Sequence, residues 1–318
     1  MSGGQAGLLT RVDYAAAPAA SSAAFEQWMH DQLARVERAL DAWVPVAAPA
    51  GLGEAMRYGV LDGGKRLRPL LVLAACRGVD GAADAALRAA VAVELIHAYS
   101  LVHDDMPCMD DDVLRRGKPT VHVRYGEAQA MLAGDAMQAL AFEVLTPQPG
   151  DERGVAPALQ ARLCGLLARA AGHAGMAGGQ AIDLASIGKP MGEQVLRDMH
   201  RRKTGALLQA SVLMGAACGD CSSRDWAALA DYGAAVGLAF QVVDDILDVT
   251  QESQILGKTA GKDLEHNKPT YVSVLGLEAA RRQALQLRDA ARAALARAER
   301  VDSDLLARLA DMVVDREC

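Results

Sequence analysis

An apolar helix with one acidic face sets the first limit on this fold. The segment FQVVDDILD carries four polar side chains at positions i, i+3, i+4 and i+7: Gln241, Asp244, Asp245 and Asp248. On an α-helix these side chains project within roughly 100° of arc, while the Val, Ile and Leu residues project elsewhere. Carboxylates are costly to bury without cations. One side of this helix therefore faces water or metal ions, and the other faces a hydrophobic core.

A second acidic cluster follows another apolar helical segment, between Glu94 and Thr120. Asp104 and Asp105 come directly after the apolar residues, and basic side chains follow them: Arg115, Arg116 and Lys118. His97 lies two helical turns before Asp104 and so projects from the same face. Two carboxylate clusters flanked by cations are what a site needs to hold divalent metal ions against a phosphorylated substrate.

Pro107 allows the two parts of this cluster to approach each other. On an unbroken helix Asp110 would project about 240° around the axis from Asp104, too far for both to reach one metal ion. Pro107 disfavours helical backbone at the preceding residue and interrupts the hydrogen-bond ladder, so the chain can turn and bring Asp110 back toward Asp104. Asp111 would align with Asp104 on an unbroken helix and is the alternative ligand.

A basic segment, LDGGKRLRP, precedes the first acidic cluster. Gly63 and Gly64 loosen the backbone, Lys65 and Arg68 supply positive charge, and Pro69 stands where a helix would start. A helix N-terminus offers unpaired N–H groups to an anion, and the basic side chains add full charges. The segment is either a phosphate-binding site or a solvated basic loop.

The composition favours helices and makes several classes of function implausible. Hydrophobic residues make up 51% of the chain and aromatic residues 4%, with few β-branched alternations typical of strands. The net charge is -7, without a basic stripe for a nucleic-acid backbone. No apolar segment is long enough to predict a membrane span. The cysteines are scattered, and the Cys218/Cys221 pair lacks further zinc ligands, so we expect reduced thiols and a cytoplasmic protein.

The beginning of the chain differs from the rest. Residues 1–24 are rich in Ala, Ser and Gly and lack the charged and apolar regions of a secretory signal, so we expect a disordered tail. From residue 25 to residue 318 we expect one domain. Its first helix is predicted from Phe25 to Val44, and further helices are predicted at Gly126–Leu145, Ala158–Ala171, Leu275–Arg297 and Ser303–Val314.

Six motifs, in order, resemble those of the trans-prenyl diphosphate synthases, specifically the bacterial farnesyl diphosphate synthases. They are LDGGKRLRP, DDMPCMDDDVLRRGKPT, GGQAIDL, MHRRKTGAL, FQVVDDILD and GKTAGKD. The resemblance implies a single all-α domain, a bundle of roughly ten or more helices around a deep central cavity, and a homodimer. It also implies the head-to-tail (1'-4) condensation of isopentenyl diphosphate with dimethylallyl or geranyl diphosphate.

The same resemblance implies a role for each matched side chain. Three Mg²⁺ ions, for which Mn²⁺ can substitute, would be held by Asp104, Asp110 and Asp244, assisted by Asp105 and Asp248. The allylic diphosphate would be bound by Arg115, Lys203 and Lys258. Isopentenyl diphosphate would be bound by Lys65, Arg68, His97 and Arg116. Oxygen dipoles facing the allylic carbocation would come from Thr204, Gln241 and the Lys203 carbonyl group.

The length of the product is predicted from the residues that precede Asp104. Tyr99 lies about 7.5 Å back along the helix axis, with Ser100 beside it. In the resembling family a bulky aromatic residue here accompanies a fifteen-carbon product, whereas small residues accompany twenty carbons or more. The alternatives are that Tyr99 is only a core aromatic residue and that the product is geranyl or geranylgeranyl diphosphate.

Two further functions are less consistent with the sequence. A terpene cyclase would carry Ser or Thr where this chain has Asp248. A non-catalytic subunit of a synthase would have lost one of the aspartate or lysine sets, and none is missing. The C-terminal DREC departs from the family, because relatives often place several basic residues there, and this chain has Arg316 alone.

Overall fold

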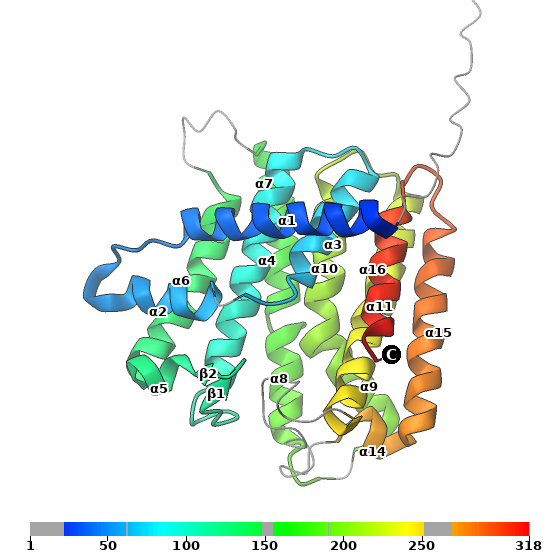
Figure 1. Ribbon diagram of the computed structural model, residues 1–318. Helices are drawn as coiled ribbons and strands as arrows, with labels where there is room; N and C mark the ends of the chain where they lie inside the picture. The colour runs from blue at the N-terminus through cyan, green and yellow to red at the C-terminus, as the bar shows by residue number, and fades with distance from the viewer. Residues whose placement is uncertain (1–21, 62, 148–154, 190, 251–268, 318) are drawn as a thin grey trace, which may run out of the picture.

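The computed structural model describes residues 22–61, 63–147, 155–189, 191–250 and 269–317. These residues form a bundle of helices and one short hairpin, which confirms the predicted all-α fold (Figure 1). The first helix, α1, begins at Ser22, slightly before the predicted start at Phe25, and ends at Trp43. Residues 1–21 of the predicted tail lie outside the described residues.

The remaining elements follow the chain in a regular order. Before the first acidic cluster come η1 (Pro49–Gly51), α2 (Leu52–Val60), α3 (Leu67–Gly78) and α4 (Ala83–Asp104). The middle of the chain forms β1 (Leu114–Arg115), β2 (Lys118–Pro119), α5 (Val121–Tyr125), α6 (Glu127–Leu145), α7 (Pro157–Ala171) and α8 (Met176–Ala185). The last part forms α9 (Glu193–His200), η2 (Arg201–Gly205), α10 (Ala206–Ala217), α11 (Ser223–Thr250), α14 (Tyr271–Leu275), α15 (Leu277–Leu295), α16 (Asp304–Val314) and η3 (Asp315–Glu317).

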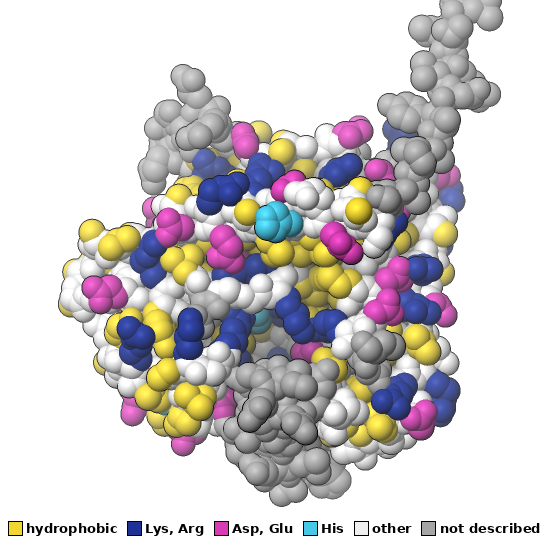
Figure 2. All heavy atoms as spheres, in the orientation of Figure 1, with side chains coloured by type: hydrophobic (Ala, Val, Ile, Leu, Met, Phe, Trp, Pro, Cys, Tyr) yellow, Lys and Arg dark blue, Asp and Glu magenta, His cyan; other side chains and the backbone are white. Residues whose placement is uncertain are grey.

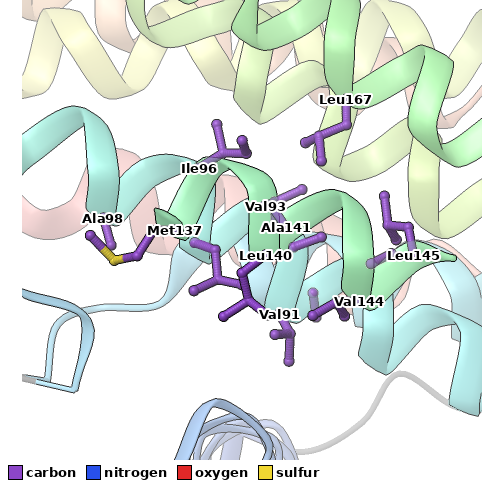
Figure 3. Packing of buried hydrophobic residues seen from close by; sticks show 14 of the residues in the cluster. Val91, Val93, Ile96, Ala98, Met137, Leu140, Ala141, Val144, Leu145 and Leu167 are labelled. Carbon is purple, nitrogen blue, oxygen red and sulfur yellow. The ribbon is translucent and has the colours of Figure 1, made fainter. Parts of the chain in front are cut away.

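Helix α4 is the centre of the first core. Val91, Val93 and Ile96 of α4 pack against Met137 of α6 and Leu167 of α7 (Figure 3). The many alanines of α4 are buried, which lets neighbouring helices approach closely. By length and composition α4 and α11 could each cross a membrane, but 67% and 56% of their apolar windows are buried inside the protein. Burial of this kind is typical of core helices in a globular bundle.

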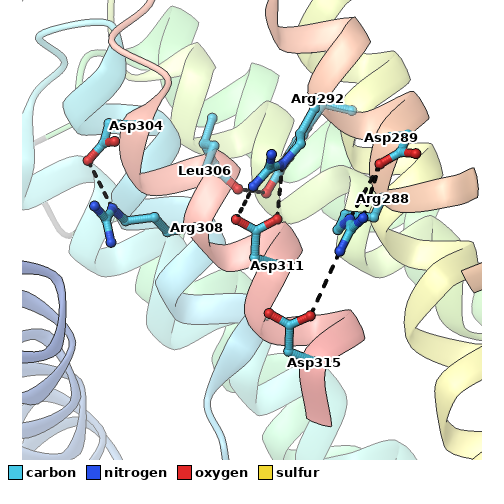
Figure 4. Close-up of polar contacts among 9 residues, drawn as sticks. Arg288, Asp289, Arg292, Asp304, Leu306, Arg308, Asp311 and Asp315 are labelled. Atoms are coloured by element: carbon cyan, nitrogen blue, oxygen red, sulfur yellow. Dashed lines mark hydrogen bonds and ion pairs between the residues drawn. The ribbon is translucent and has the colours of Figure 1, made fainter. Parts of the chain in front are cut away.

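Helix α11 is the centre of the second core, together with α15 and α16. The Tyr232 hydroxyl donates to the carbonyl oxygen of Leu306 over 2.6 Å, which ties α11 to α16. On the surface Arg292 of α15 pairs with Asp311 of α16 (Figure 4). These contacts hold α11 and α15 against α16.

Close helix contacts in the middle of the bundle require glycine. A Cβ atom at Gly215 of α10 would lie 2.1 Å from the carbonyl oxygen of Val72 in α3. Helix α1 lies across the bundle, over α3 and α4 (Figure 1). The last two turns of α4 line a cavity, together with residues of α8 and η2.

Candidate active site

A cavity of about 370 Å³ opens between α4, α8 and the turn η2. Its lining combines polar and apolar side chains, among them Arg68, His97, Tyr99, Asp104, Met176, Gln180, Lys203 and Thr204. Figure 2 shows that one face of the protein is hollowed at its centre, with Lys and Arg side chains on both sides of the hollow. The deep cavity predicted from the sequence is therefore present.

The first acidic cluster turns back on itself, as predicted. Helix α4 ends at Asp104, before Pro107, and the Asp110 N–H donates to the Asp104 carbonyl oxygen over 2.9 Å. The alternative ligand Asp111 is exposed and has a φ of 51°. The backbone turn therefore places Asp110, rather than Asp111, beside Asp104.

The electrostatics of Asp104 suit a cation. Burial, and then the nearby charge of Asp110, raise the pKa of Asp104 to about 6, against the lowering effect of Lys203. A pair of carboxylates in this environment is relieved of repulsion when a divalent ion binds. Among the described residues no three acidic, His or Cys side chains converge enough to hold a metal ion by themselves. This donor set therefore fits Mg²⁺ that takes further oxygen ligands from water or a diphosphate.

Asp105 and Arg115 form a paired unit beside this cluster. The Arg115 Nε lies 2.9 Å from each carboxylate oxygen of Asp105, and its Nη2 lies 2.6 Å from Oδ1. Arg115 belongs to the two-stranded hairpin, in which it faces Lys118. Bidentate pairing of this kind fixes the hairpin against the end of α4. Asp105 is thus held by a cation of the protein itself in this structure.

Asp248 of α11 is buried, and the other three polar residues of this acidic face have named partners. Asp244 is half-exposed, and its Oδ1 lies 3.4 Å from the Arg316 guanidinium near the end of the chain. Asp245 is buried and accepts hydrogen bonds from the Gln241 side chain over 2.9 Å and from the Tyr271 N–H over 2.7 Å. Gln241 in turn accepts from the Thr204 hydroxyl over 2.8 Å. Asp245 therefore anchors α14 and orients Gln241.

Lys203 and Thr204 lie on a π-helical turn, η2, between α9 and α10. The Lys203 ammonium lies 2.6 Å from Oδ2 of the buried Asp183 in α8. Burial would lower the pKa of Lys203, but Asp183 and then Asp104 outweigh it and raise the pKa. A Cβ atom at Gly179 would lie 2.2 Å from the Lys203 backbone nitrogen, so glycine is required where α8 meets this turn.

A group of basic side chains lies beside the acidic clusters. Burial, and then Arg68 and Arg116, hold the pKa of His97 well below its usual range, so the imidazole is neutral at pH 7. The Arg116 guanidinium donates to the Gly63 carbonyl oxygen. Arg68 is buried with the charge of Asp244 nearby, and the Lys65 ammonium is near Arg316 and Asp244. These cations could hold an anion next to the two acidic clusters.

Tyr99 lines the cavity on α4. Its hydroxyl accepts from the Gln138 amide of α6 over 3.4 Å, and its ring meets the His103 ring edge-to-face at 5.7 Å. His103 lies 3.0 Å from the Met131 carbonyl oxygen, and Gly134 leaves room for its ring. The Ser100 hydroxyl donates to the His97 carbonyl oxygen, so it is not a free polar group.

Known proteins with the same features identify the family. The family model described as polyprenyl synthetase matches residues 49–307. This chain belongs to the polyprenyl synthetase family. The large subunit 1 of a heterodimeric geranylgeranyl pyrophosphate synthase from Arabidopsis thaliana is 47% identical over 275 residues, covering 86% of this chain and 74% of that one.

Solved structures of the family agree with this fold. An FPP/GFPP synthase from Zymomonas mobilis is 40% identical, with a TM-score of 0.79, covering 91% of this chain and 98% of that chain. A geranyltransferase from Helicobacter pylori, complexed with magnesium and isoprenyl diphosphate, is 31% identical, with a TM-score of 0.79, covering 93% and 98%. The chain is therefore a prenyltransferase of the isoprenoid synthase fold.

Buried polar residues to which the sequence analysis assigned no role lie in or near the cavity of this polyprenyl synthetase. Gln180 is buried on the cavity wall, and neither amide atom has a hydrogen-bond partner among the described residues. Asp183 binds Lys203, and His200 stacks on Tyr271. Gln180 and Asp183 share one face of α8, which is the signal that could have found them. Lys258, predicted to bind diphosphate, lies outside the described residues.

Arg66 ties the basic segment LDGGKRLRP of this polyprenyl synthetase to α1 and α4. It is buried in a left-handed backbone conformation, with Nη1 2.6 Å from Glu94, Nε 2.7 Å from Glu37 and Nη2 2.6 Å from the Val60 carbonyl oxygen. We expect Arg66→Met to lower the free energy of unfolding by about 3 kcal/mol, because it leaves the Glu94 carboxylate buried without its partner. Urea unfolding measures this loss.

The exposed Arg77 provides the matched control for Arg66. Arg77→Met removes the same charge from the surface of α3 and should change the free energy of unfolding by less than about 0.5 kcal/mol. Equal losses in the two variants would show that the buried network does not stabilise the fold.

His200 should make stability depend on pH. Burial lowers the pKa of His200 from 6.5 to about 4. Between these two pH values the imidazole is protonated in the unfolded chain and neutral in the folded chain. This contribution is complete above about pH 6.5 and is lost as the pH falls toward 4, for a total of about 3 kcal/mol. We expect urea unfolding of His200→Phe to lose correspondingly less stability between pH 7 and pH 4. The exposed His30, replaced in the same way, should leave the pH dependence unchanged.

Proposed function

We propose that this prenyltransferase is a farnesyl diphosphate synthase, which joins isopentenyl diphosphate to dimethylallyl and then geranyl diphosphate. The observation that carries the proposal is a cavity that has both Asp104 and Tyr99 in its wall. The head of an allylic substrate would bind at the carboxylates, and its apolar chain would extend toward Tyr99.

The acidic residues would hold Mg²⁺ with the allylic diphosphate. The ligands we propose are Asp104, Asp110 and Asp244, with Asp105 and Asp248 assisting. When bound, Mg²⁺ would neutralise the departing diphosphate and so favour cleavage of the allylic C–O bond. Arg115 and Lys203 would add positive charge to the same diphosphate, and Asp183 keeps the Lys203 ammonium charged and in place.

The remaining side chains would guide the carbon–carbon bond. Thr204 lines the cavity and is hydrogen-bonded to Gln241. The oxygens of these two residues would face the allylic carbon without providing a strong nucleophile. The neutral His97 imidazole, together with Lys65, Arg68 and Arg116, would bind the diphosphate of isopentenyl diphosphate. The released diphosphate would accept the final proton.

Product analysis tests the proposal directly. The purified chain is incubated with isopentenyl and geranyl diphosphates and Mg²⁺, and the products are measured by mass. We expect farnesyl diphosphate as the main product and loss of turnover in EDTA. A main product of twenty or more carbons would overturn the farnesyl assignment and leave the reaction class standing, whereas absence of condensation would overturn both.

A second candidate function is geranylgeranyl diphosphate synthesis. The observation in its favour is the 47% identity to the Arabidopsis large subunit, whose name gives that product. Tyr99 in the cavity wall favours the shorter product. We further propose that the chain acts as a homodimer in the cytoplasm, which gel filtration and cell fractionation would test.

A further inference from the structure

A second cavity, the rear groove, lies behind the turn that carries Lys203 and Thr204. Its floor is α10, its walls are α7 and α11, and one end is closed by η2. Its volume of about 360 Å³ is close to the 370 Å³ of the active-site cavity. The rear groove shares no lining residue with that cavity, so it has room for a separate ligand of similar size.

The rear groove is basic at one end. Three of its lining residues are arginines, Arg169, Arg201 and Arg202, and no lining residue is acidic. Asp198 pairs with two of them, at 2.6 Å from Arg201 and 2.8 Å from Arg202. Three guanidinium groups against one carboxylate leave a net positive charge at this end. An anion with several oxygens would complete the hydrogen bonding of the arginines.

The other end of the rear groove is apolar. From Gly205 of η2 the lining proceeds along α10 through Ala206 and Ala210 to Leu213, a distance of about 12 Å at 1.5 Å per residue. The one polar residue in this stretch is Gln209, whose amide donates to the Ala230 carbonyl oxygen. Leu166 of α7 adds to the apolar wall. The charged end and the apolar end therefore suit one extended molecule with an anionic head and a hydrocarbon chain.

We propose that the rear groove binds a prenyl diphosphate, with its diphosphate at the arginines and its chain along α10. The choice of the prenyl diphosphate class rests on the proposed function, because that class is what the active site would release. The ligand's head would contact the rear of η2, whose other side carries Lys203 and Thr204 into the active site.

Measuring the binding of a prenyl diphosphate analogue without metal helps to distinguish the rear groove from the active site. Without Mg²⁺ the aspartates of the active site repel a diphosphate, whereas the arginines of the rear groove need no metal. Because Lys65, Arg68 and Arg116 could still hold an anion in the active site, variants of the rear groove decide where the molecule binds. Calorimetry with farnesyl thiolodiphosphate in EDTA should show one molecule bound per wild-type chain. Arg169→Glu should weaken this binding about tenfold or more, and Leu213→Glu should weaken it similarly by charging the apolar end. Arg77→Glu, a charge reversal on an exposed arginine of α3, should not weaken it.

Two comparison ligands test whether the rear groove needs both a diphosphate and a hydrocarbon chain, and an activity assay tests the proposed function separately. Inorganic diphosphate and palmitate should each bind at least tenfold more weakly than farnesyl thiolodiphosphate. Equal binding of either, no binding in EDTA, or unchanged binding by Arg169→Glu would overturn the proposal. Arg169 is on the surface, so its variant tests the site even if Leu213→Glu fails to fold. Condensation by the same wild-type sample shows independently whether the proposed function holds.

Discussion

Asp104→Asn is expected to lower kcat of the condensation about a thousandfold. Asparagine keeps the shape of the side chain but removes the charge that would hold Mg²⁺ at the end of α4, and a loss of about 4 kcal/mol of transition-state stabilisation corresponds to this factor. Steady-state rates at saturating Mg²⁺ measure the effect. The fold should not suffer, because burial raises the pKa of Asp104 to about 6 and ionised Asp104 opposes folding at pH 7.

Asp111→Asn is the matched control for this prediction. Asp111 is exposed, and its φ of 51° is one that asparagine tolerates, so rates should change less than about twofold. A large loss in Asp111→Asn with little loss in Asp104→Asn would show that the metal ligands had been assigned wrongly.

Tyr99→Ala is expected to change the main product from fifteen carbons to twenty or more. The substitution removes the aromatic ring from the cavity wall, so a growing chain can pass the level of residue 99. Mass analysis of the products after incubation with geranyl and isopentenyl diphosphates measures the distribution. The reaction rate should change much less than the product, because Tyr99 is remote from the carboxylates that would hold the metal.

Tyr99→Phe separates the ring from the hydroxyl group. Phenylalanine retains the ring and loses the hydrogen bond from Gln138. If the ring stops chain growth, this variant keeps the wild-type product. An unchanged product in Tyr99→Ala, or the same lengthening in both variants, would defeat the assignment of Tyr99 as the stopping residue.

Much of the fold could be predicted because helical periodicity is a local signal. The predicted helix Ser303–Val314 corresponds to α16, Asp304–Val314, and Gly126–Leu145 corresponds to α6, Glu127–Leu145. The turn after Asp104 was predictable because proline acts on its immediate neighbours. The glycine-rich segment that forms α8 was not, because its helix depends on close packing against η2 rather than on propensity.

The partners of the site residues were less accessible from the sequence. Nothing local indicates that Arg115 pairs with Asp105 or that Lys203 pairs with Asp183. These pairs join segments that meet only after the bundle has formed. Arg316 beside Asp244 is a further example, because the C-terminal departure from the family left its position open. Sequence periodicity could thus identify which acidic and basic residues belong to the site. Which of them form ion pairs with each other is decided by tertiary packing.

The π-helical turn at Arg201–Gly205 has a consequence for how this family can vary. A π-turn holds one more residue than the α-turn that it replaces. Deleting one residue from η2 would restore a straight helix and rotate Lys203 and Thr204 about 100° relative to α10. A one-residue deletion here would therefore displace two active-site groups at once, whereas a substitution in η2 would change only one side chain.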